Sequence, residues 1–266
     1  MFTADGQRML LVCTEAARLP ASTSGPSYFE RGDTLRAVRA LYMAAQRWWQ
    51  HEDALCRVAH ELSERNFVVL DAFLGEAELV AALRGRCLAL GASAHSPSGF
   101  EALTSLVDLL ISELRQCADL SADLERVEGR TSFAVSKLAP GGSQGRHVDN
   151  PASSSTLASL TVVYYMQDHT WDAKRGGCLR VFRPEAEQAS GAAAAVDSSA
   201  ALADVEPVSD RLIVFFADGR CPHAVLPVCG ADRYSAVLFY GPRKASERLG
   251  EDDAEDFEVG HMIWDE

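Results

Sequence analysis

No stretch of this 266-residue sequence approaches the roughly 18 consecutive apolar residues of a membrane-spanning helix, so we expect no membrane association. Positive charge is scarce: 38 Asp and Glu residues outnumber 25 Lys and Arg residues, and the formal net charge is −13. Clustered Lys and Arg bind nucleic-acid phosphates, so this balance argues against a nucleic-acid partner. We also predict no signal peptide, because the apolar run at residues 9–13 is short and Glu15 follows it.

Paired cysteine motifs are absent as well. The seven cysteines are odd in number and include no CxxC pair, which makes a disulfide framework or a structural zinc site a poor explanation for them. A protein of this kind fits a reducing compartment. We therefore expect a cytoplasmic protein, with the nucleus as a second location. The cysteines are Cys13, Cys56, Cys87, Cys117, Cys178, Cys221 and Cys229.

The remaining composition is that of an ordinary globular chain, with 47% hydrophobic and 24% charged residues. We divide it into an N-terminal arm and helical extension (1–65), a main domain (66–245) and an acidic C-terminal tail (246–266). Within the main domain, the Ala- and Ser-rich residues at about 185–203 read as a mobile surface insertion. Helical spacing of apolar residues predicts helices at 35–49, 55–62, 75–90 and 101–120.

Beyond residue 120 the hydrophobic period changes from 3.6 to 2, which predicts short strands separated by turns. Helices followed by strands indicate an α+β fold, in which the helices buttress one face of a sandwich or barrel. Residues 91–99 are small and polar and read as a loop. We expect a first strand at 66–70 and later strands at 131–138, 159–166, 177–182, 211–216, 223–228 and 234–240.

The stretch RHVDNP contains the first candidate for chemistry. On extended backbone, His147 and Asp149 project to the same side, because side chains alternate along a strand. His223, on a distant predicted strand, can supply a third ligand. Two histidines and one carboxylate on one face of a metal leave three positions open, as in non-haem Fe(II) oxygenases.

A second candidate lies ten residues beyond His223. On a strand, Arg233 and Ser235 share one face, and a guanidinium pointing into a β-structure needs an anion. A dicarboxylate co-substrate meets that need if one end chelates the metal and the other meets Arg233. The alternative is an internal Asp or Glu that pairs with Arg233.

These motifs resemble those of a known family. HVDNP, SLTVVYYMQ, WDAKRGGCLRVF, DVEPVSDRLIVFFADGRCPHAVLPV and RYS follow one another as in the Fe(II)- and 2-oxoglutarate-dependent prolyl 4-hydroxylases. The resemblance is closest to the hypoxia-inducible-factor prolyl hydroxylases and their protist and bacterial relatives, and it runs from about residue 66 to residue 240. It implies a double-stranded β-helix, a relative of the jelly roll, packed against N-terminal helices.

The resemblance also assigns residues. His147, Asp149 and His223 match the iron ligands, and no catalytic residue beyond the iron centre is implied. Arg233 matches the arginine that holds the distal carboxylate of 2-oxoglutarate. Phe239 stands where the family has a tryptophan. The residues that match the rest of the co-substrate pocket are Tyr165, Thr161, Ser235, Val163, Leu179 and Lys137.

The implied activity is hydroxylation of a prolyl residue at the trans-4 position in an intracellular protein. The implied cofactor is Fe(2+), with 2-oxoglutarate and O2 as co-substrates, succinate and CO2 as co-products, and ascorbate as a reductant. We expect a monomer. Two alternatives stay open: a catalytically silent module of this fold that binds proline-containing peptides, and a dioxygenase that acts on a non-prolyl substrate.

Two departures from the family pattern bear on these expectations. Lys137 stands where the family has a tyrosine that reaches 2-oxoglutarate; the lysine could donate to the same oxygen or point outward. The oxygen-sensing enzymes carry a long loop over the bound peptide, and here it shrinks to residues 91–99. The shorter loop leaves the mouth of the site more open and puts the peptide substrate in question.

Overall fold

The computed structural model describes residues 48–50, 53–90, 93–95, 99–151, 158–184 and 200–242. These residues belong to one compact unit, which begins at Trp48. In this part of the chain, no helix is long and apolar enough to cross a membrane. Most of the helix predicted at 35–49, most of the insertion at 185–203 and the acidic tail lie outside the described residues. The three-segment division of the chain stays a prediction.

The described helices bury apolar residues at helical spacing. Helix α3 (Ala54–Arg65) buries Val58, Ala59 and Leu62, and it ends at Asn66, whose left-handed backbone (φ 65°) stops the helix. Helix α4 (Ala77–Leu90) buries Val80, Leu83 and Cys87. Helix α5 (Glu101–Leu114) buries a longer stripe that includes Leu103, Leu110 and Leu114. A 3-10 turn, η1 (Trp48–Gln50), precedes α3, and its Trp49 is fully buried in the core.

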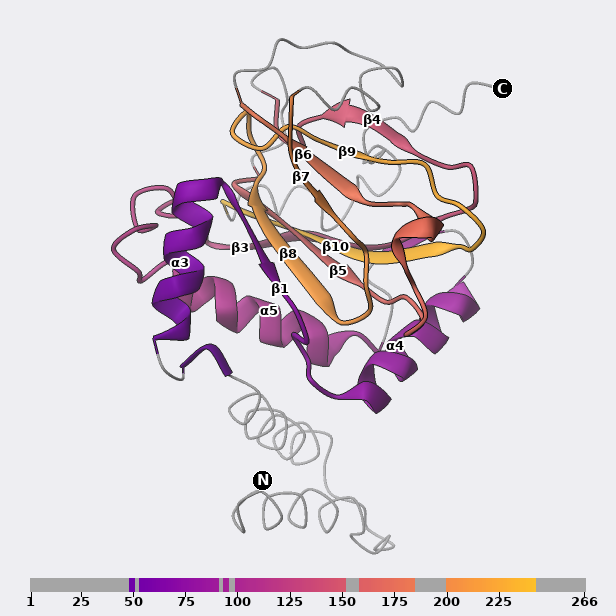
Figure 1. The fold of residues 1–266 in the computed structure, drawn as a ribbon. Helices are drawn as coiled ribbons and strands as arrows, with labels where there is room; N and C mark the ends of the chain where they lie inside the picture. Colours follow the sequence, from indigo (N-terminus) through magenta and orange to yellow (C-terminus); the bar gives the residue numbers. More distant parts are fainter. Residues whose placement is uncertain are drawn as a thin grey trace, which may run out of the picture. The chain divides into compact units, whose positions relative to one another are not determined.

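Six antiparallel strands form the larger sheet (Figure 1). Its central strands are almost entirely apolar, as expected for a sheet covered on both faces. The order across the sheet is β1 (Phe67–Leu70), β8 (Arg211–Phe216), β5 (Leu160–Tyr165), β10 (Arg233–Gly241), β3 (Gly129–Leu138) and β2 (Ser93–His95).

Four antiparallel strands form the smaller sheet, which faces the larger one in Figure 1. Its order is β4 (Gln144–His147), β9 (His223–Val225), β6 (Leu179–Phe182) and β7 (Ala201–Val205). A buried cluster fills the space between the sheets and draws from both, with Val163, Ile213 and Phe215 on one side and Leu179 and Val225 on the other. Two facing antiparallel sheets with helices outside them form the predicted double-stranded β-helix.

Helices α4 and α5 cover the outer face of the larger sheet, as Figure 1 shows. The contacts agree with this view. The Cys87 thiol on α4 lies 3.5 Å from the sulfur of Met166, and the Phe100 ring before α5 lies 5.4 Å from that of Phe133 on β3. The predicted buttress is therefore present. Because side chains alternate along each strand, every second residue of the larger sheet faces the smaller sheet, and the residues between them face the helices.

Several boundaries differ from those that the sequence predicts. Residues 93–95, predicted as loop, form strand β2, because their backbone pairs with β3 at the edge of the sheet. Residues 201–203, predicted as part of the insertion, begin β7, which pairs with β6. The helix predicted to reach residue 120 ends at Leu114 and continues as turns. These two strands form through backbone pairing, and their sequences show no regular alternation of apolar and polar residues that would have predicted them.

The turn before β8 is built on Asp210, which adopts left-handed backbone (φ 60°). Its carboxylate accepts hydrogen bonds from the backbone N–H groups of Leu74 and Gly75 and from the Tyr164 hydroxyl. Neighbouring Arg211 instead pairs with Asp71, at 2.5 Å. Asp210 and Arg211 therefore both fix the segment that follows β1, each through its own partners.

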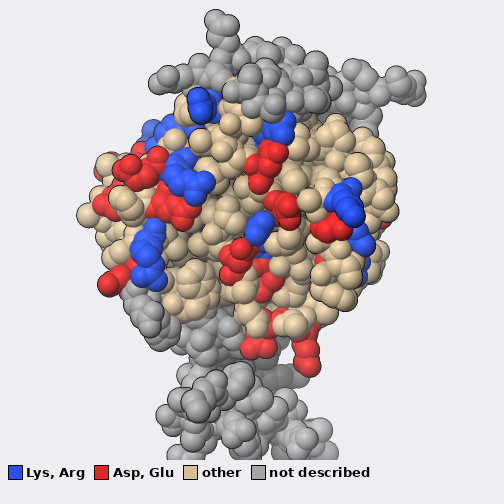
Figure 2. Space-filling model, in the orientation of Figure 1, with Lys and Arg blue, Asp and Glu red and all other residues tan. Residues whose placement is uncertain are grey.

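Charges on the face shown in Figure 2 are mixed in sign: blue and red side chains lie beside one another. Ion pairs of the described residues include Arg211 with Asp71 and Arg180 with Asp204, which has two hydrogen bonds of 2.7 Å. An Arg paired with a neighbouring carboxylate is less available to phosphates.

Candidate metal centre

Two neighbouring strands of the smaller sheet bring the three predicted ligands together. His147 ends β4 and pairs directly with His223, the first residue of β9. The imidazole centroids lie 4.3 Å apart. Asp149, two residues beyond His147, places Oδ1 at 3.4 Å from Nε2 of His147 and 3.6 Å from Nε2 of His223. All three ligand atoms lie within 4.8 Å of one another, so one ion can contact all of them.

Backbone carbonyls fix the orientation of both imidazoles. Nδ1 of His147 lies 2.9 Å from the carbonyl oxygen of Gly145, and Nδ1 of His223 lies 3.0 Å from that of Cys221. A carbonyl oxygen only accepts, so each Nδ1 carries the proton and each Nε2 keeps a free lone pair. Ligating histidines in metalloproteins are commonly held in this way by their second nitrogen.

The charge states suit a cation. Burial lowers the pKa of His223 to about 4, so its imidazole is neutral near pH 7 and has no proton to lose when it binds a metal. Burial alone raises the pKa of Asp149. The two imidazoles and Thr161 outweigh that effect and lower the pKa to about 2, so the carboxylate is ionised. Burial alone lowers the pKa of His147, but the hydrogen bond and charge of Asp149 outweigh burial and raise it, so a metal would displace a proton there. Two imidazoles and one anionic carboxylate are the ligand set of the facial triad of non-haem Fe(II) sites.

Thr161 lies beside the metal ligands. Its hydroxyl donates to Oδ2 of Asp149 at 2.6 Å, so Oδ1 is the oxygen that faces both histidines. The resemblance assigned Thr161 to the co-substrate pocket, whereas in the structure its hydroxyl bonds the Asp149 carboxylate. Thr161 therefore orients a ligand, and the clue lay in its parity: on β5 it shares a face with Val163 and Tyr165.

Replacing Thr161 with valine is expected to weaken Fe(II) binding about 10- to 100-fold, because partners of metal ligands commonly contribute that much. Anaerobic titration with Fe(II) measures the change. Thr104→Val is a matched control, since Thr104 is also buried and bonds only a backbone carbonyl of α5. Unchanged iron affinity together with weaker 2-oxoglutarate binding would assign Thr161 to the co-substrate instead.

Arg233 is buried between the sheets, with 5% of its surface exposed. Its Nε donates to the carbonyl oxygen of Gly177 at 2.9 Å, and one Nη donates to the Tyr165 hydroxyl at 3.2 Å. The other Nη lies 3.5 Å from the Ser235 hydroxyl. Among the described residues, no carboxylate lies within 4 Å of this guanidinium, so the alternative of an internal Asp or Glu partner is not realised there. A buried cation with only neutral partners is a site for an anion.

The other predicted pocket residues line the same interior. Ser235 pairs directly with Tyr165, Val237 with Val163, and Phe239 with Thr161, so all of them share the inward face of the larger sheet. Leu179 belongs to the same buried cluster from the opposite sheet. Burial raises the pKa of Tyr165, so its hydroxyl stays protonated. It can accept from Arg233 and donate its own proton to a ligand.

Lys137 does not face this interior. In the pairing of β10 with β3 it lies opposite Tyr234, whereas Arg233 lies opposite Leu138 and Ser235 opposite Ser136. Its ammonium pairs with Asp232 at 2.8 Å, and this hydrogen bond raises the pKa of Lys137. The assignment of Lys137 to the co-substrate is thus corrected: of the two alternatives, the outward one is present, because side chains alternate along β3.

Two functional contacts were not anticipated from the sequence. The Gly177 carbonyl holds Arg233. Asn150 ties the segment after Asp149 in place, since its side chain donates to the Ala158 carbonyl at 2.8 Å and its backbone N–H to that of Ala217 at 2.7 Å. Asn directly after an HxD pair is a weak signal for such a clamp. A glycine pair gives no sequence signal beyond a turn.

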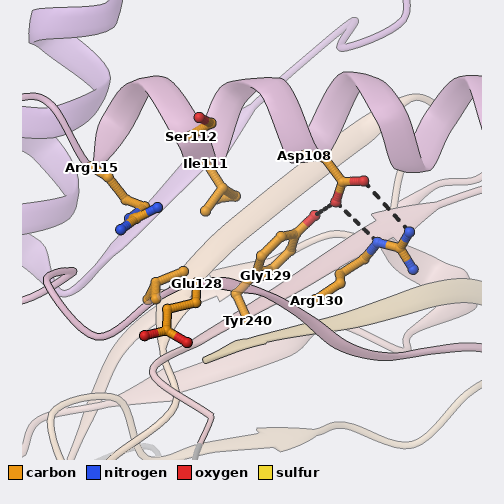
Figure 3. A pocket seen from close by; sticks show the side chains of 9 residues that line it. Asp108, Ile111, Ser112, Arg115, Glu128, Gly129, Arg130 and Tyr240 are labelled. Carbon is orange, nitrogen blue, oxygen red and sulfur yellow. Dashed lines mark hydrogen bonds and ion pairs between the residues drawn. The ribbon is translucent and has the colours of Figure 1, made fainter. Parts of the chain in front are cut away.

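A pocket of about 350 Å³ lies on the helix side of the larger sheet, between α5, the start of β3 and the end of β10 (Figure 3). In Figure 3, Tyr240 and Arg130 point to the carboxylate of Asp108, at 2.6 and 3.0 Å. Tyr240 pairs with Leu160 and therefore has the parity that faces the helices. This pocket is separate from the metal centre and contains none of its residues.

Comparison with known proteins agrees with this geometry. Residues 133–241 match the model of the 2OG-Fe(II) oxygenase superfamily, and this range holds all three ligands and Arg233. Among curated proteins, Egl nine homolog 1 of Rattus norvegicus is 36% identical over 145 residues, which are 53% of this chain and 37% of that protein. Prolyl hydroxylase EGLN3 of Homo sapiens is 35% identical over 145 residues, 53% of each chain. The chain thus spans about half or less of these relatives.

Solved structures give the same result. A Trichoplax adhaerens prolyl hydroxylase, in complex with a hypoxia-inducible-factor oxygen degradation domain peptide, superimposes with a TM-score of 0.59 at 25% identity, over 77% of this chain and 98% of that one. A Pseudomonas putida prolyl-4-hydroxylase gives a TM-score of 0.53 at 26% identity, over 71% and 92%. The likeness extends beyond the family match to most of the described chain.

Proposed function

We propose that this chain, which contains a 2OG-Fe(II) oxygenase domain, is an Fe(II)- and 2-oxoglutarate-dependent dioxygenase that hydroxylates a prolyl residue of a protein at the trans-4 position. Succinate and CO2 are the co-products. We place its substrate in the cytoplasm or nucleus. The observation that carries the proposal is Arg233, a buried guanidinium with no carboxylate partner among the described residues, in the same interior as the triad of His147, Asp149 and His223.

Each residue of the site has a distinct task. His147, Asp149 and His223 would hold the iron, which, when bound with 2-oxoglutarate and O2, supplies the oxidation of an unactivated C–H bond. Arg233 and Tyr165 would bind the distal carboxylate of 2-oxoglutarate with charge-assisted hydrogen bonds. Apolar walls such as Val163 and Leu179 keep water from that ion pair, which strengthens it.

A prolyl substrate is supported by the relatives. The human relative EGLN3 is named a prolyl hydroxylase, and the Trichoplax adhaerens structure is a prolyl hydroxylase with a bound peptide. Among the described residues, strand β4, which ends at His147, is the outermost strand of the smaller sheet and pairs with β9. An extended peptide that added to this edge would lie beside the triad.

The target chemistry can be tested directly. Proteins of a cell lysate, incubated with the purified chain, Fe(II), 2-oxoglutarate and O2, are expected to gain one oxygen atom on specific prolyl residues. Mass spectrometry of peptides locates the gain, and a parallel incubation without 2-oxoglutarate gives the background. Gains confined to residues other than proline would overturn the prolyl assignment and favour a dioxygenase with another substrate.

The silent binding module makes a different prediction. Anaerobic Fe(II) and 2-oxoglutarate are expected to give a weak visible charge-transfer band with the wild-type chain, because the triad leaves room for a chelating co-substrate. A folded protein without this band would be a binding module. Appearance of the band, with succinate formed when O2 is admitted, would establish the enzyme.

A further inference from the structure

Two consecutive glycines, Gly176 and Gly177, join the 3-10 turn η2 (Ala173–Arg175) to β6. Both adopt left-handed backbone, with φ of 62° and 69°, which residues with a side chain rarely adopt. The N–H of Gly177 donates to the Pro227 carbonyl at 3.0 Å, which fixes its peptide. Its own carbonyl therefore has a set direction, and it accepts the Nε hydrogen of Arg233 at 2.9 Å.

The missing side chain of Gly177 also matters. A Cβ at this position would lie 2.9 Å from Cδ of Arg233 and 3.3 Å from Cγ2 of Val228. The first distance is shorter than real Cβ contacts, so the aliphatic stem of Arg233 lies against the bare Cα. Gly176 differs, because a Cβ there would meet the backbone oxygen of Pro227 at 2.2 Å. Only the second glycine of the pair touches the arginine.

We propose that Gly177 is a positioning residue for Arg233, and through it a determinant of affinity for the 2-oxo-dicarboxylate co-substrate. This inference rests on the proposed function. The Gly177 carbonyl accepts the Nε hydrogen of Arg233. Because Gly177 has no side chain, the aliphatic part of Arg233 can pass between Gly177 and Val228. The two Nη groups then point to Tyr165 and Ser235.

The physical benefit is preorganisation. A free arginine side chain has many rotamers, and binding a ligand must remove that conformational freedom. In this protein the Arg233 side chain is already restricted before a ligand binds, because its aliphatic part packs against Gly177, Nε bonds the Gly177 carbonyl and one Nη bonds the Tyr165 hydroxyl. The guanidinium is planar, so fixing Nε also fixes the plane in which the Nη hydrogens meet a carboxylate. A methyl group at Gly177 would push Cδ away and turn that plane.

The test is Gly177→Ala in the full chain, with 2-oxoglutarate titrated anaerobically into the Fe(II)-loaded protein and the charge-transfer band as readout. We expect the Kd for 2-oxoglutarate to rise about tenfold or more, with Fe(II) affinity within about twofold of the wild type. Gly75→Ala is the matched control. Gly75 has the same left-handed backbone (φ 66°), but a Cβ there meets only the Ala72 oxygen at 3.8 Å, an ordinary contact.

A double-mutant cycle separates positioning from a general structural role. In an Arg233→Ala background the added methyl group has no arginine stem to displace, so Gly177→Ala is expected to change the Kd for 2-oxoglutarate by less than about twofold. This background also relieves the close contact, so the protein can be measured even if the single variant folds poorly.

Each outcome is decisive. An equal penalty in both backgrounds, an unchanged Kd in the single variant, or parallel loss of iron and 2-oxoglutarate would overturn the positioning role. If the wild-type chain itself gives no band with Fe(II) and 2-oxoglutarate, the proposed function fails. A normal wild-type band with an indifferent Gly177→Ala variant refutes only the inference about Gly177.

Discussion

Replacing Arg233 with alanine is expected to weaken 2-oxoglutarate binding by about 100-fold or more while Fe(II) affinity stays within about twofold. In the proposed site Arg233 supplies the positive charge for the distal carboxylate. Its hydrogen-bond partners in the described part of the chain are Gly177, Tyr165 and Ser235, not the triad. Removing one partner of a buried charge pair costs about 2–5 kcal/mol, and 1.4 kcal/mol is about tenfold in affinity. Anaerobic titration of the charge-transfer band measures 2-oxoglutarate, and titration with Fe(II) alone measures the metal.

Lys137→Ala is the matched control for this experiment. It also removes a cation close to the site, but Lys137 pairs with Asp232 on the other face of the sheet. We expect its 2-oxoglutarate affinity to stay within about twofold of the wild type, because an exposed ion pair contributes little. A large loss of 2-oxoglutarate affinity in Lys137→Ala would show that Lys137 contributes to co-substrate binding after all. Equal losses of iron and co-substrate in Arg233→Ala would contradict the role of Arg233.

The contrast between Lys137 and Arg233 shows what sequence could predict. Alternation along a strand fixes which residues share a face, so Arg233 and Ser235 could be grouped without a structure. It does not fix which face points inward. Which face points inward depends on pairing with other strands, and the apolar residues around Lys137 did not indicate whether its side chain points inward or outward. The register of β10 against β3 settles it, by setting Lys137 opposite Tyr234.

The metal ligands were predictable for a different reason. An HxD pair and a distant histidine carry chemistry in their side chains, so residue type alone narrows the choices. Strand β4, which carries His147, was missed as a strand because its sequence, QGRH, is polar and has no alternation. The hydroxyl of Thr161 on Asp149 and the carbonyl of Gly177 on Arg233 are contacts across strands. Only the fold brings these partners together.

Strands β2 and β7 illustrate the same limit at the sheet edges. Among the described residues each is the outermost strand of its sheet and pairs with one neighbour. The sequence of β2 (SAH) is small and polar, and β7 continues an Ala- and Ser-rich stretch, so both segments were predicted as loop. Strand β2 lies close to the site. It follows α4 and pairs with β3, which itself contributes Leu138 to the interior cluster.

Replacing Asp149 with alanine is expected to lower Fe(II) affinity by at least about 100-fold and to abolish the charge-transfer band. Asp149 is the only anionic ligand of the predicted triad, and its Oδ1 lies within 3.6 Å of both Nε2 atoms. Without it, two neutral imidazoles remain, which bind a hard cation weakly. Thermal unfolding gives an independent measurement, since a ligand that binds only the folded state raises the melting temperature.

Asp71→Ala provides the control, because Asp71 is a largely exposed carboxylate that pairs with Arg211 away from the triad. It should retain iron-dependent stabilisation, and Asp149→Ala should lose it. The two site variants are expected to differ in which ligand they lose. Arg233→Ala keeps iron and loses 2-oxoglutarate, whereas Asp149→Ala loses both, because the co-substrate needs the metal for its near end. Iron-dependent stabilisation that survives in Asp149→Ala would place the metal outside this triad, and Arg233 would then need another anion.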